Sequence, residues 1–214
     1  MTVTEIALVH LTAGTSIDDI DIRSKLSHAK NIMQNYTGYQ FYYMRQIEDP
    51  SYLYIIGEWE SLDQHMNHFI PGDENQAVLA SLKDEIVVDW LLHIDASHDN
   101  LPVPKTIKEK EKCHRGDLMW SIERHFVKAG QKDGFQQAFD DNSWHLQSFV
   151  TEGMIGGGWR VDQEDNEEEW VLLCPWQKVE QHSKFAELDG FARYDQIQQH
   201  LRGAEVKHAK LLEI

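Results

Sequence analysis

The sequence predicts an α+β fold built from two tandem units, each with the order β-α-β-β-α-β of ferredoxin-like domains. First, strand-like and helix-like segments run through this order twice. Second, a signature leading from a Trp to a His six residues later occurs in both halves, as Trp59–His65 and Trp176–His182. Third, residues 96–117 contain two of the five prolines and a run of charge, which is typical of a linker. We therefore expect unit 1 at residues 1–95 and unit 2 at residues 118–214.

In the first unit, each element has a local signal. An apolar run predicts the first strand, and apolar residues at helical spacing after Thr15-Ser16 predict a helix. Two aromatic-rich strands joined across Pro50 suggest an antiparallel hairpin. Pro71-Gly72 interrupts the second helical region, and a last apolar run predicts the fourth strand. The expected elements are strand 6–11, helix 17–33, strands 39–47 and 52–58, helical pieces 61–83 and strand 85–94.

The second unit repeats this order after the linker. Ala129-Gly130 follows its first strand as Ala13-Gly14 follows the first strand of unit 1. Its second strand opens with three glycines, 156–158, which either open a pocket or let another backbone approach closely. The expected elements are strand 118–127, helix 135–146, strands 154–161 and 170–173, helical segments to residue 201 and strand 205–214.

Direct alignment of the two halves indicates a duplication. Residues 53–59 align with residues 170–176, and the match continues to His65 and His182 at the same offset. In the last strand, Leu91-Leu92 aligns with Leu211-Leu212 at an offset three residues larger. A four-stranded sheet with helices on one face leaves its other face apolar. We therefore expect the two sheets to pack face to face as a pseudo-dimer within one chain, so that a monomer suffices, with a weak homodimer left open.

The composition argues against several classes of partner. The formal charge is −16, from 36 acidic and 20 basic residues, and such a surface repels nucleic acid and anionic membranes. No apolar run is long enough to span a bilayer, and the first ten residues lack the pattern of a secretory signal. The two cysteines, Cys113 and Cys174, form no metal or disulfide motif. We expect a cytoplasmic protein.

Residues 54–69, which run from the strand through Trp59 and His65 to Phe69, resemble the antibiotic biosynthesis monooxygenase-like family of dimeric α/β barrels. Residues 172–185 look similar, and the order of elements matches over nearly the whole chain apart from the linker, as in tandem fungal members. The resemblance implies two units packed sheet to sheet as an intramolecular barrel, with a cavity for a small organic molecule in each unit. Such relatives include cofactor-independent monooxygenases of aromatic polyketides, haem-degrading enzymes, and cyclases or isomerases of secondary metabolism.

Histidine is the first candidate for chemistry, because its ordinary pKa lies near neutrality. His65 and His68, on the helix after Trp59, could act as general base or proton donor for a phenol or enol. Alternatively, His65 and His182 pack on Trp59 and Trp176 and fix helix to sheet. We favour this structural interpretation, because a pair kept in both halves serves the shared fold more naturally than one catalytic event.

Residues that differ between the halves are therefore more informative. The aromatic strand of unit 1 presents Tyr39, Phe41, Tyr43 and Arg45 on one face, which suits a planar aromatic ligand or, alternatively, fills the core. The predicted catalytic residues are His65, His68, Tyr43 and Arg45. The predicted binding residues are Trp59, Phe41, Tyr39, Phe69, Trp176 and His182.

No cofactor has a signature here. Terminal strands carry His10, His93, His125 and His208, but no motif with metal-ligand spacing accompanies them, so we expect no metal. Nucleotide-binding motifs are absent as well, and haem bound through a lone axial His is left open. We expect a cofactor-independent, monooxygenase-like enzyme acting on a small aromatic or polyketide-like molecule. The alternatives are a non-oxidative cyclase, isomerase or dehydratase on the same substrates, and a non-catalytic ligand-binding or stress-response barrel.

Overall fold

The computed structural model describes residues 1–163 and 167–214 and divides the chain into two compact units. Unit 1 comprises residues 1–97 with residues 211–214, and unit 2 comprises residues 98–210. Both contain the predicted β-α-β-β-α-β order, so the tandem ferredoxin-like fold is confirmed. The face-to-face packing of the two sheets stays a prediction. Within the described residues, no helix is long and apolar enough to cross a bilayer.

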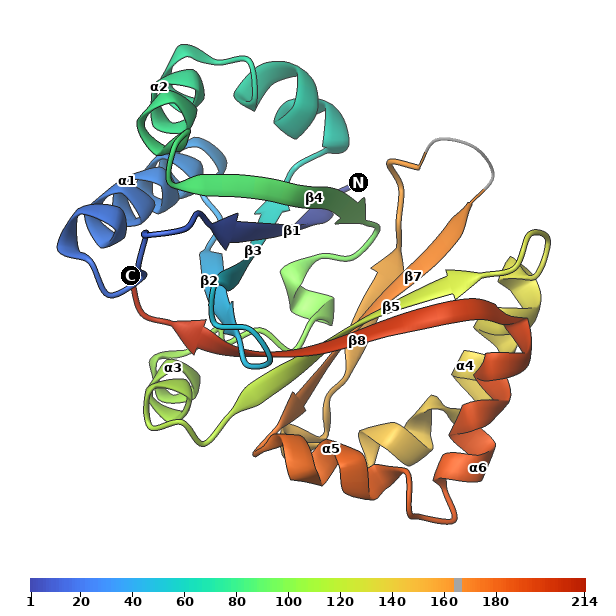
Figure 1. Cartoon of the computed structure of the whole chain (residues 1–214). Helices are drawn as coiled ribbons and strands as arrows, with labels where there is room; N and C mark the ends of the chain where they lie inside the picture. Colours follow the sequence, from blue (N-terminus) through green and yellow to red (C-terminus); the bar gives the residue numbers. More distant parts are fainter. Residues whose placement is uncertain (164–166) are drawn as a thin grey trace. The chain divides into compact units, whose positions relative to one another are not determined.

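Unit 1 is an antiparallel sheet with helices on one face (Figure 1). Its strands lie in the order β4-β1-β3-β2. The predicted hairpin is confirmed, because β2 pairs with β3 in antiparallel register. The elements are β1 (Val3–Leu11), α1 (Ile20–Thr37), β2 (Phe41–Gln46), β3 (Tyr52–Trp59), the π-helix η1 (Gln64–Phe69), α2 (Asp73–Leu82) and β4 (Ile86–Ile94).

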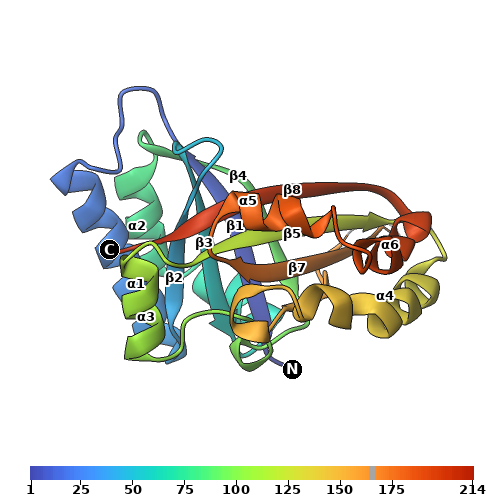
Figure 2. The ribbon, with the colours of Figure 1, turned by 90° about the horizontal axis from the view of Figure 1, so that it is seen from below.

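Unit 2 has the same architecture, with strand order β8-β5-β7-β6 and α4, α5 and α6 on one side of its sheet (Figures 1 and 2). Its elements are the 3-10 helix η2 (His98–Asn100), α3 (Ile107–His114), β5 (Met119–Val127), α4 (Lys132–Gln147), the 3-10 helix η3 (Thr151–Gly153), β6 (Gly156–Trp159), β7 (Glu168–Trp176), α5 (Val179–Phe185), α6 (Phe191–Tyr194), the 3-10 helix η4 (Asp195–His200) and β8 (Leu201–Leu212).

The segment 96–117, expected to be a linker, contains the helix α3, and residues 98–117 belong to unit 2. Thr106 and Glu109 form a capping box at the start of α3, each side chain bonding the other residue's backbone N–H. Upstream of α3, the Nε1 of Trp120 donates a hydrogen bond to the carbonyl of Pro102 at 2.6 Å. The capping-box spacing was the signal of structure in this charged segment.

The strand registers correct part of the alignment between the halves. Val3 pairs with Trp59 as Met119 pairs with Trp176. On the other side of these strands, Glu5 pairs with His93 and Ser121 pairs with His208. His93 and His208 are therefore equivalent, and the alignment of Leu91 with Leu211 was wrong. The connections before the last strand are two residues shorter in unit 2 rather than longer, and a Leu-Leu pair is too common to define the register.

The turns after the first strand are alike in both units. Gly14 has φ of 92° and Gly130 has φ of 71°, in the left-handed region that glycine enters without strain. Each glycine lets the chain leave its strand and turn towards the helix that follows. The recurrence of Ala-Gly at these two places thus has a conformational cause, which supports the duplication.

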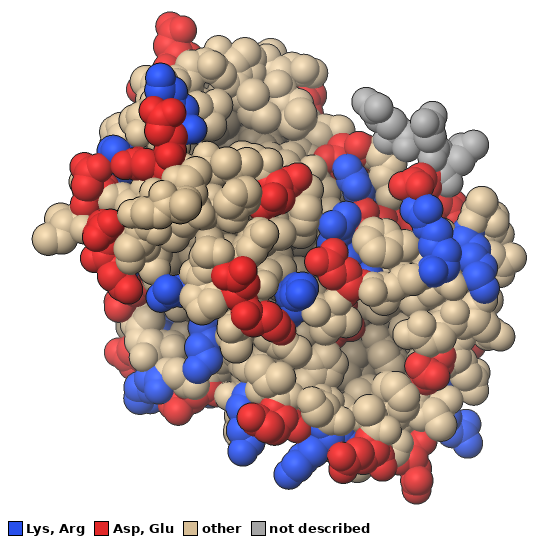
Figure 3. All heavy atoms as spheres, in the orientation of Figure 1, with Lys and Arg blue, Asp and Glu red and all other residues tan. Residues whose placement is uncertain are grey.

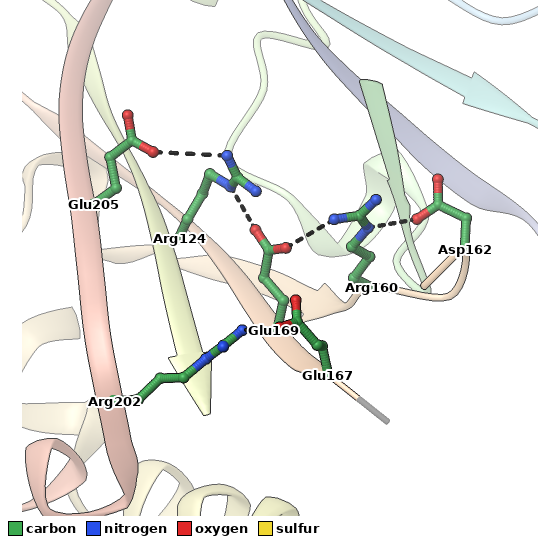
Figure 4. A network of polar contacts seen from close by, with 7 residues as sticks. All are labelled: Arg124, Arg160, Asp162, Glu167, Glu169, Arg202 and Glu205. Atoms are coloured by element: carbon green, nitrogen blue, oxygen red, sulfur yellow. Dashed lines mark hydrogen bonds and ion pairs between the residues drawn. The ribbon is translucent and has the colours of Figure 1, made fainter. Parts of the chain in front are cut away.

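Charged residues pair near the ends of β5, β6 and β7 in unit 2 (Figure 4). The carboxylate of Glu169, only 3% exposed, accepts hydrogen bonds from Nε of Arg124 at 2.5 Å and from Nη1 of Arg160 at 3.1 Å. Asp162 accepts a second bond from Arg160 at 2.7 Å. A buried carboxylate requires such partners, so the network holds the ends of β5, β6 and β7 together. Elsewhere acidic side chains are scattered among basic ones on the face shown in Figure 3.

Candidate active site in unit 1

A cavity lies between the sheet of unit 1 and its helices α1 and α2. Its volume is about 370 Å³, at the lower end of the range for small-molecule sites. Ala7, Val9 and Ile55 of the sheet and Leu26 and Ala29 of α1 contribute to its walls. Most of the other lining residues are apolar too. The cavity therefore suits a ligand that is apolar over most of its surface.

Glu5 of β1 is the acidic side chain that lines this cavity. It shares a face of the strand with Ala7 and Val9 and is 4% exposed. Nε1 of Trp59 donates a hydrogen bond to its Oε2 at 2.8 Å. Burial raises the pKa of Glu5 to about 7, although the hydrogen bond from Trp59 and the charge of His93 act in the opposite direction. Near neutral pH this carboxyl can therefore accept or donate a proton.

His65 connects Glu5 to His93 on the neighbouring strand β4. It comes from the π-helix η1, and its ring stacks on Trp59 with 3.9 Å between centroids and 8° between planes. Its Nε2 lies 3.7 Å from Oε2 of Glu5, and its Nδ1 shares a hydrogen bond of 2.6 Å with Nε2 of His93. Glu5, His65 and His93 thus form a row of titratable groups that begins at the cavity wall.

Sequence reasoning missed Glu5. The signal was there, because strand alternation places Val3, Glu5, Ala7 and Val9 on one face, and a lone carboxylate on an otherwise apolar face is unusual. The sequence indicates His93 only as a candidate metal ligand. Its contact with His65 depends on the pairing of β4 with β1, which the sequence does not specify.

Several predicted residues do meet at the cavity. His65, Tyr43 and Phe69 line it, and the hydroxyl of Tyr43 donates a hydrogen bond to the carbonyl of Leu26 at 3.1 Å. Burial raises the pKa of Tyr43 well above its ordinary value, so this phenol stays neutral. Phe41 and Trp59 pack edge to face with 5.4 Å between centroids, in a buried cluster with Phe69.

Gly57 makes room for this cluster. A Cβ at Gly57 would lie 1.9 Å from the ring of Phe41, which faces it across β2 and β3. The small residue two positions before Trp59 is therefore a packing requirement of the aromatic ring on the neighbouring strand.

The structure does not bring three other predicted residues to the cavity. The side chain of His68 is 64% exposed and its Nε2 lies 3.2 Å from Asp63. Arg45 donates from Nε to the carbonyl of Pro50 at 3.0 Å, in an exposed position. Tyr39 precedes β2 and is half-buried. For His68 the cause is the helix geometry, because the π-helical turn buries His65 and Phe69 and leaves His68 on the outer side.

Unit 2 keeps the aromatic and histidine part of this arrangement. His182 stacks on Trp176 with 4.4 Å between centroids, and its Nδ1 bonds Nε2 of His208 at 2.9 Å. Ser121 stands where unit 1 has Glu5, and its hydroxyl accepts the hydrogen bond from Nε1 of Trp176 at 2.8 Å. Burial lowers the pKa of His182 to about 4, so this ring is neutral at pH 7.

The carboxyl of unit 2 has moved two residues along the strand. Glu123 occupies the register position of Ala7 and accepts a hydrogen bond from Ser121 at 2.7 Å. Burial raises the pKa of Glu123 to about 7, against hydrogen bonds from Ser121 and Cys174. His125 similarly stands where unit 1 has Val9, and burial lowers its pKa to about 4.

Large side chains occupy the space between sheet and helices in unit 2. Trp170 replaces Leu53 in register and packs on Phe139 with 5.3 Å between centroids. Other rings of this cluster are Phe135, Trp159 and Tyr194. Gly156 and Gly157 do not open a pocket here, because a Cβ on Gly156 would lie 2.0 Å from the carbonyl of Asn100. Close approach of backbone, the second predicted alternative, explains them.

The residues present do not fit a haem iron in the cavity. An axial histidine needs a ring nitrogen free for the metal, and both nitrogens of His65 face protein groups, Nδ1 facing His93 and Nε2 facing Glu5. Among the residues that the structure describes, no group of three or more His, Cys, Asp or Glu side chains is arranged to hold a metal ion.

No protein-family model and no curated protein matches the chain. Solved structures match it over nearly its whole length. A protein from Fusobacterium nucleatum subsp. nucleatum, named as a monooxygenase, is 11% identical with a TM-score of 0.66, covering 99% of this chain and 93% of its own. A protein named as a chlorite dismutase is 15% identical with a TM-score of 0.63, and the match covers 99% of this chain and 95% of that protein. An anthrone oxidase-like protein is 10% identical with a TM-score of 0.63, covering 99% and 92%.

At such identities these likenesses establish the fold. The chain is a tandem ferredoxin-like protein with the same α+β fold as these solved structures. The resemblance to monooxygenase-like proteins noted in its sequence is confirmed at the level of the fold.

Proposed function

We propose that unit 1 is a small-molecule enzyme that transfers a proton between its substrate and Glu5, and that it works as a cofactor-independent monooxygenase. The observation that carries the proposal is the single buried carboxyl, with a pKa of about 7, on the wall of an apolar cavity. Substrates of this chemistry are phenols, enols and activated carbon acids of aromatic or polyketide-like type. The two buried free cysteines suit a cytoplasmic setting.

In the proposed reaction, the Glu5 carboxylate removes a proton from the substrate. The hydrogen bond from Trp59 holds the carboxylate in place, and His65 lies close enough to exchange the proton with Glu5 after a small movement. The resulting anion is electron-rich and reacts with molecular oxygen. The apolar walls exclude water from the anion, which strengthens its interactions with the protein groups.

Anthrone is a suitable first probe, because one protein of this fold is named anthrone oxidase-like. Loss of a proton from its central CH₂ group gives an anthrolate anion. Anthrone and O₂ then yield anthraquinone and water, which balances the atoms. Oxygen uptake and quinone absorbance follow the reaction.

The test compares Glu5→Gln with Glu123→Gln. Both variants remove a buried carboxyl of similar pKa, but only the first removes it from the cavity. A general base contributes about 100-fold to 10,000-fold, so Glu5→Gln should lower kcat by at least about 100-fold, while Glu123→Gln stays near wild type. Equal losses in both variants, or none in Glu5→Gln, would contradict the proposal.

A non-oxidative cyclase or isomerase is the second candidate. The row of Glu5, His65 and His93 supplies proton transfer, and proton transfer alone drives enolate isomerisation. Deuterium exchange at the CH₂ of anthrone under nitrogen separates the two cases. Exchange that depends on Glu5 without quinone formation in air supports the isomerase. Binding without exchange or turnover supports a non-catalytic ligand-binding protein.

A further inference from the structure

The cavity of unit 1 has a charged residue towards each end. Glu5 pairs with His93 near the end of β4, whereas the other end of β1 pairs with Ile86. Lys83 lies three residues before Ile86, at the C-terminal end of α2, and also lines the cavity. Glu5 and Val9 are four residues apart and both line the wall. At about 3.3 Å per residue, this wall is about 13 Å long.

The remaining polar groups along the wall already have partners. The hydroxyl of Tyr43 bonds the carbonyl of Leu26, and the side-chain amide of Asn75 bonds the carbonyl of Ile70 at 3.0 Å. Between the two charged ends, the lining is therefore apolar side chains and satisfied polar groups. A ligand that fits it has an apolar middle.

Lys83 differs from Lys25, which pairs with Asp21 and Glu85, in having no acidic partner among the described residues. The carboxylate of Glu85 is 2.8 Å from the ammonium of Lys25, so it is already paired. Within the described residues, the side chain of Lys83 makes no hydrogen bond or ion pair. Lys83 is thus an exposed, unpaired cation among the residues that line an apolar cavity, in a protein with a formal charge of −16.

We propose that the cavity binds an elongated, mostly apolar molecule with a carboxylate at one end, and that Lys83 binds this carboxylate. The carboxylate would stay at the exposed mouth, and the opposite end would reach Glu5 and His65. A charge-assisted hydrogen bond to an ammonium is about twice as strong as a neutral one. This inference names the substrate class of the proposed active site and rests on that site being the binding site.

Binding of decanoate and decanol tests the inference without relying on turnover. The two probes share an apolar chain and differ in the charged head. Lys83→Gln should weaken decanoate about 5-fold to 10-fold, as expected for one charge-assisted hydrogen bond, and change decanol by less than about twofold. Lys108→Gln on α3 is the matched control, because it removes the same charge from an exposed site in unit 2. Titration calorimetry at fixed ionic strength gives the constants.

A substitution that fills the cavity tests whether the probes bind there. Ala7→Leu adds bulk at a position where unit 2 carries Glu123, so the sheet accommodates a longer side chain there. It should weaken both probes at least about 10-fold, with an unchanged circular dichroism spectrum. Equal effects of Lys83→Gln on decanoate and decanol, or binding that survives Ala7→Leu, would overturn the inference. Turnover of anthrone by Lys83→Gln reports on the proposed function separately, because anthrone has no carboxylate.

Discussion

Units 1 and 2 share an anchor and differ in what surrounds it. In both, a Trp stacks on a His that bonds a second His on the last strand of the unit. In unit 1 the carboxyl at the anchor is Glu5, and small residues leave a cavity beside it. In unit 2 the carboxyl lies two residues further on, at Glu123, and larger residues occupy the space. The duplicated anchor thus serves the fold, and the positions that differ determine whether a ligand can enter.

The strongest test of this comparison transfers the arrangement of unit 2 into unit 1. The double variant Glu5→Ser, Ala7→Glu places the residue types of Ser121 and Glu123 at the equivalent positions of unit 1. It should lower anthrone turnover at least about 100-fold, through loss of the base, and abolish decanol binding, because the new side chain enters the cavity. The reverse exchange, Ser121→Glu with Glu123→Ala, is the control and should leave anthrone turnover near wild type. Turnover that survives the first exchange would break the comparison.

The aromatic filling of unit 2 should be costly to remove. Trp170→Leu places the residue of unit 1 at the equivalent register and leaves a void beside Phe139. Large-to-small changes in a core lower the free energy of unfolding by about 2–5 kcal/mol. Urea unfolding measures this loss. Leu188→Ala is the control, because Leu188 is 42% exposed and should cost much less. A loss below about 1 kcal/mol at Trp170 would mean that the rings of unit 2 are loosely packed.

The buried Glu5 should make stability depend on pH in one direction. Its pKa rises from about 4.5 to about 7 on folding, so the folded state holds the proton more tightly. The stabilisation is present below pH 4.5 and is lost as pH rises through 7. Glu5→Gln cannot ionise, so its stability relative to wild type should increase by about 1–3 kcal/mol from pH 5 to 8.

The free energy of unfolding of Glu5→Gln is compared with that of wild type at each pH, because other buried groups titrate too. The contribution of Glu123 to stability changes with pH in the same direction as that of Glu5. The pKa values of His98, His125 and His182 are lowered to about 4. These three histidines therefore make the folded protein more stable as pH rises from 4 to 6.5. These contributions cancel when Glu5→Gln is compared with wild type. A flat difference between pH 5 and 8 would show that Glu5 is not desolvated.

The smallest effect is expected at His68. Its side chain is exposed and lies beside Asp63, and exposed pairs of this kind contribute little to stability. His68→Ala should leave anthrone kcat within about twofold, whereas His65→Ala should lower it because the row from Glu5 to His93 is broken. Parallel kinetics with the two variants decide this. A large loss at His68 would restore the original assignment of that residue.

The sequence predicted the order of elements, the hairpin and the stacked Trp59–His65 pair, because these depend on local periodicity and on a repeated motif. It also indicated that differences between the halves matter more than their shared signature. It did not predict Glu5 as part of the site, or the contact between His65 and His93. Both depend on which strands pair and in which register, and alternation along one strand does not contain that information.

The different positions of Glu5 and Glu123 follow the geometry of a strand. Because side chains alternate along a strand, a move of one residue would place the carboxyl on the opposite face, and a move of two slides it along the same face. The equivalents of Glu5 and Ala7 in unit 2 are Ser121 and Glu123. In a duplicated chain, exchanges at two positions can therefore move the carboxyl away from a site in one copy, while the shared Trp and His residues keep both copies folded.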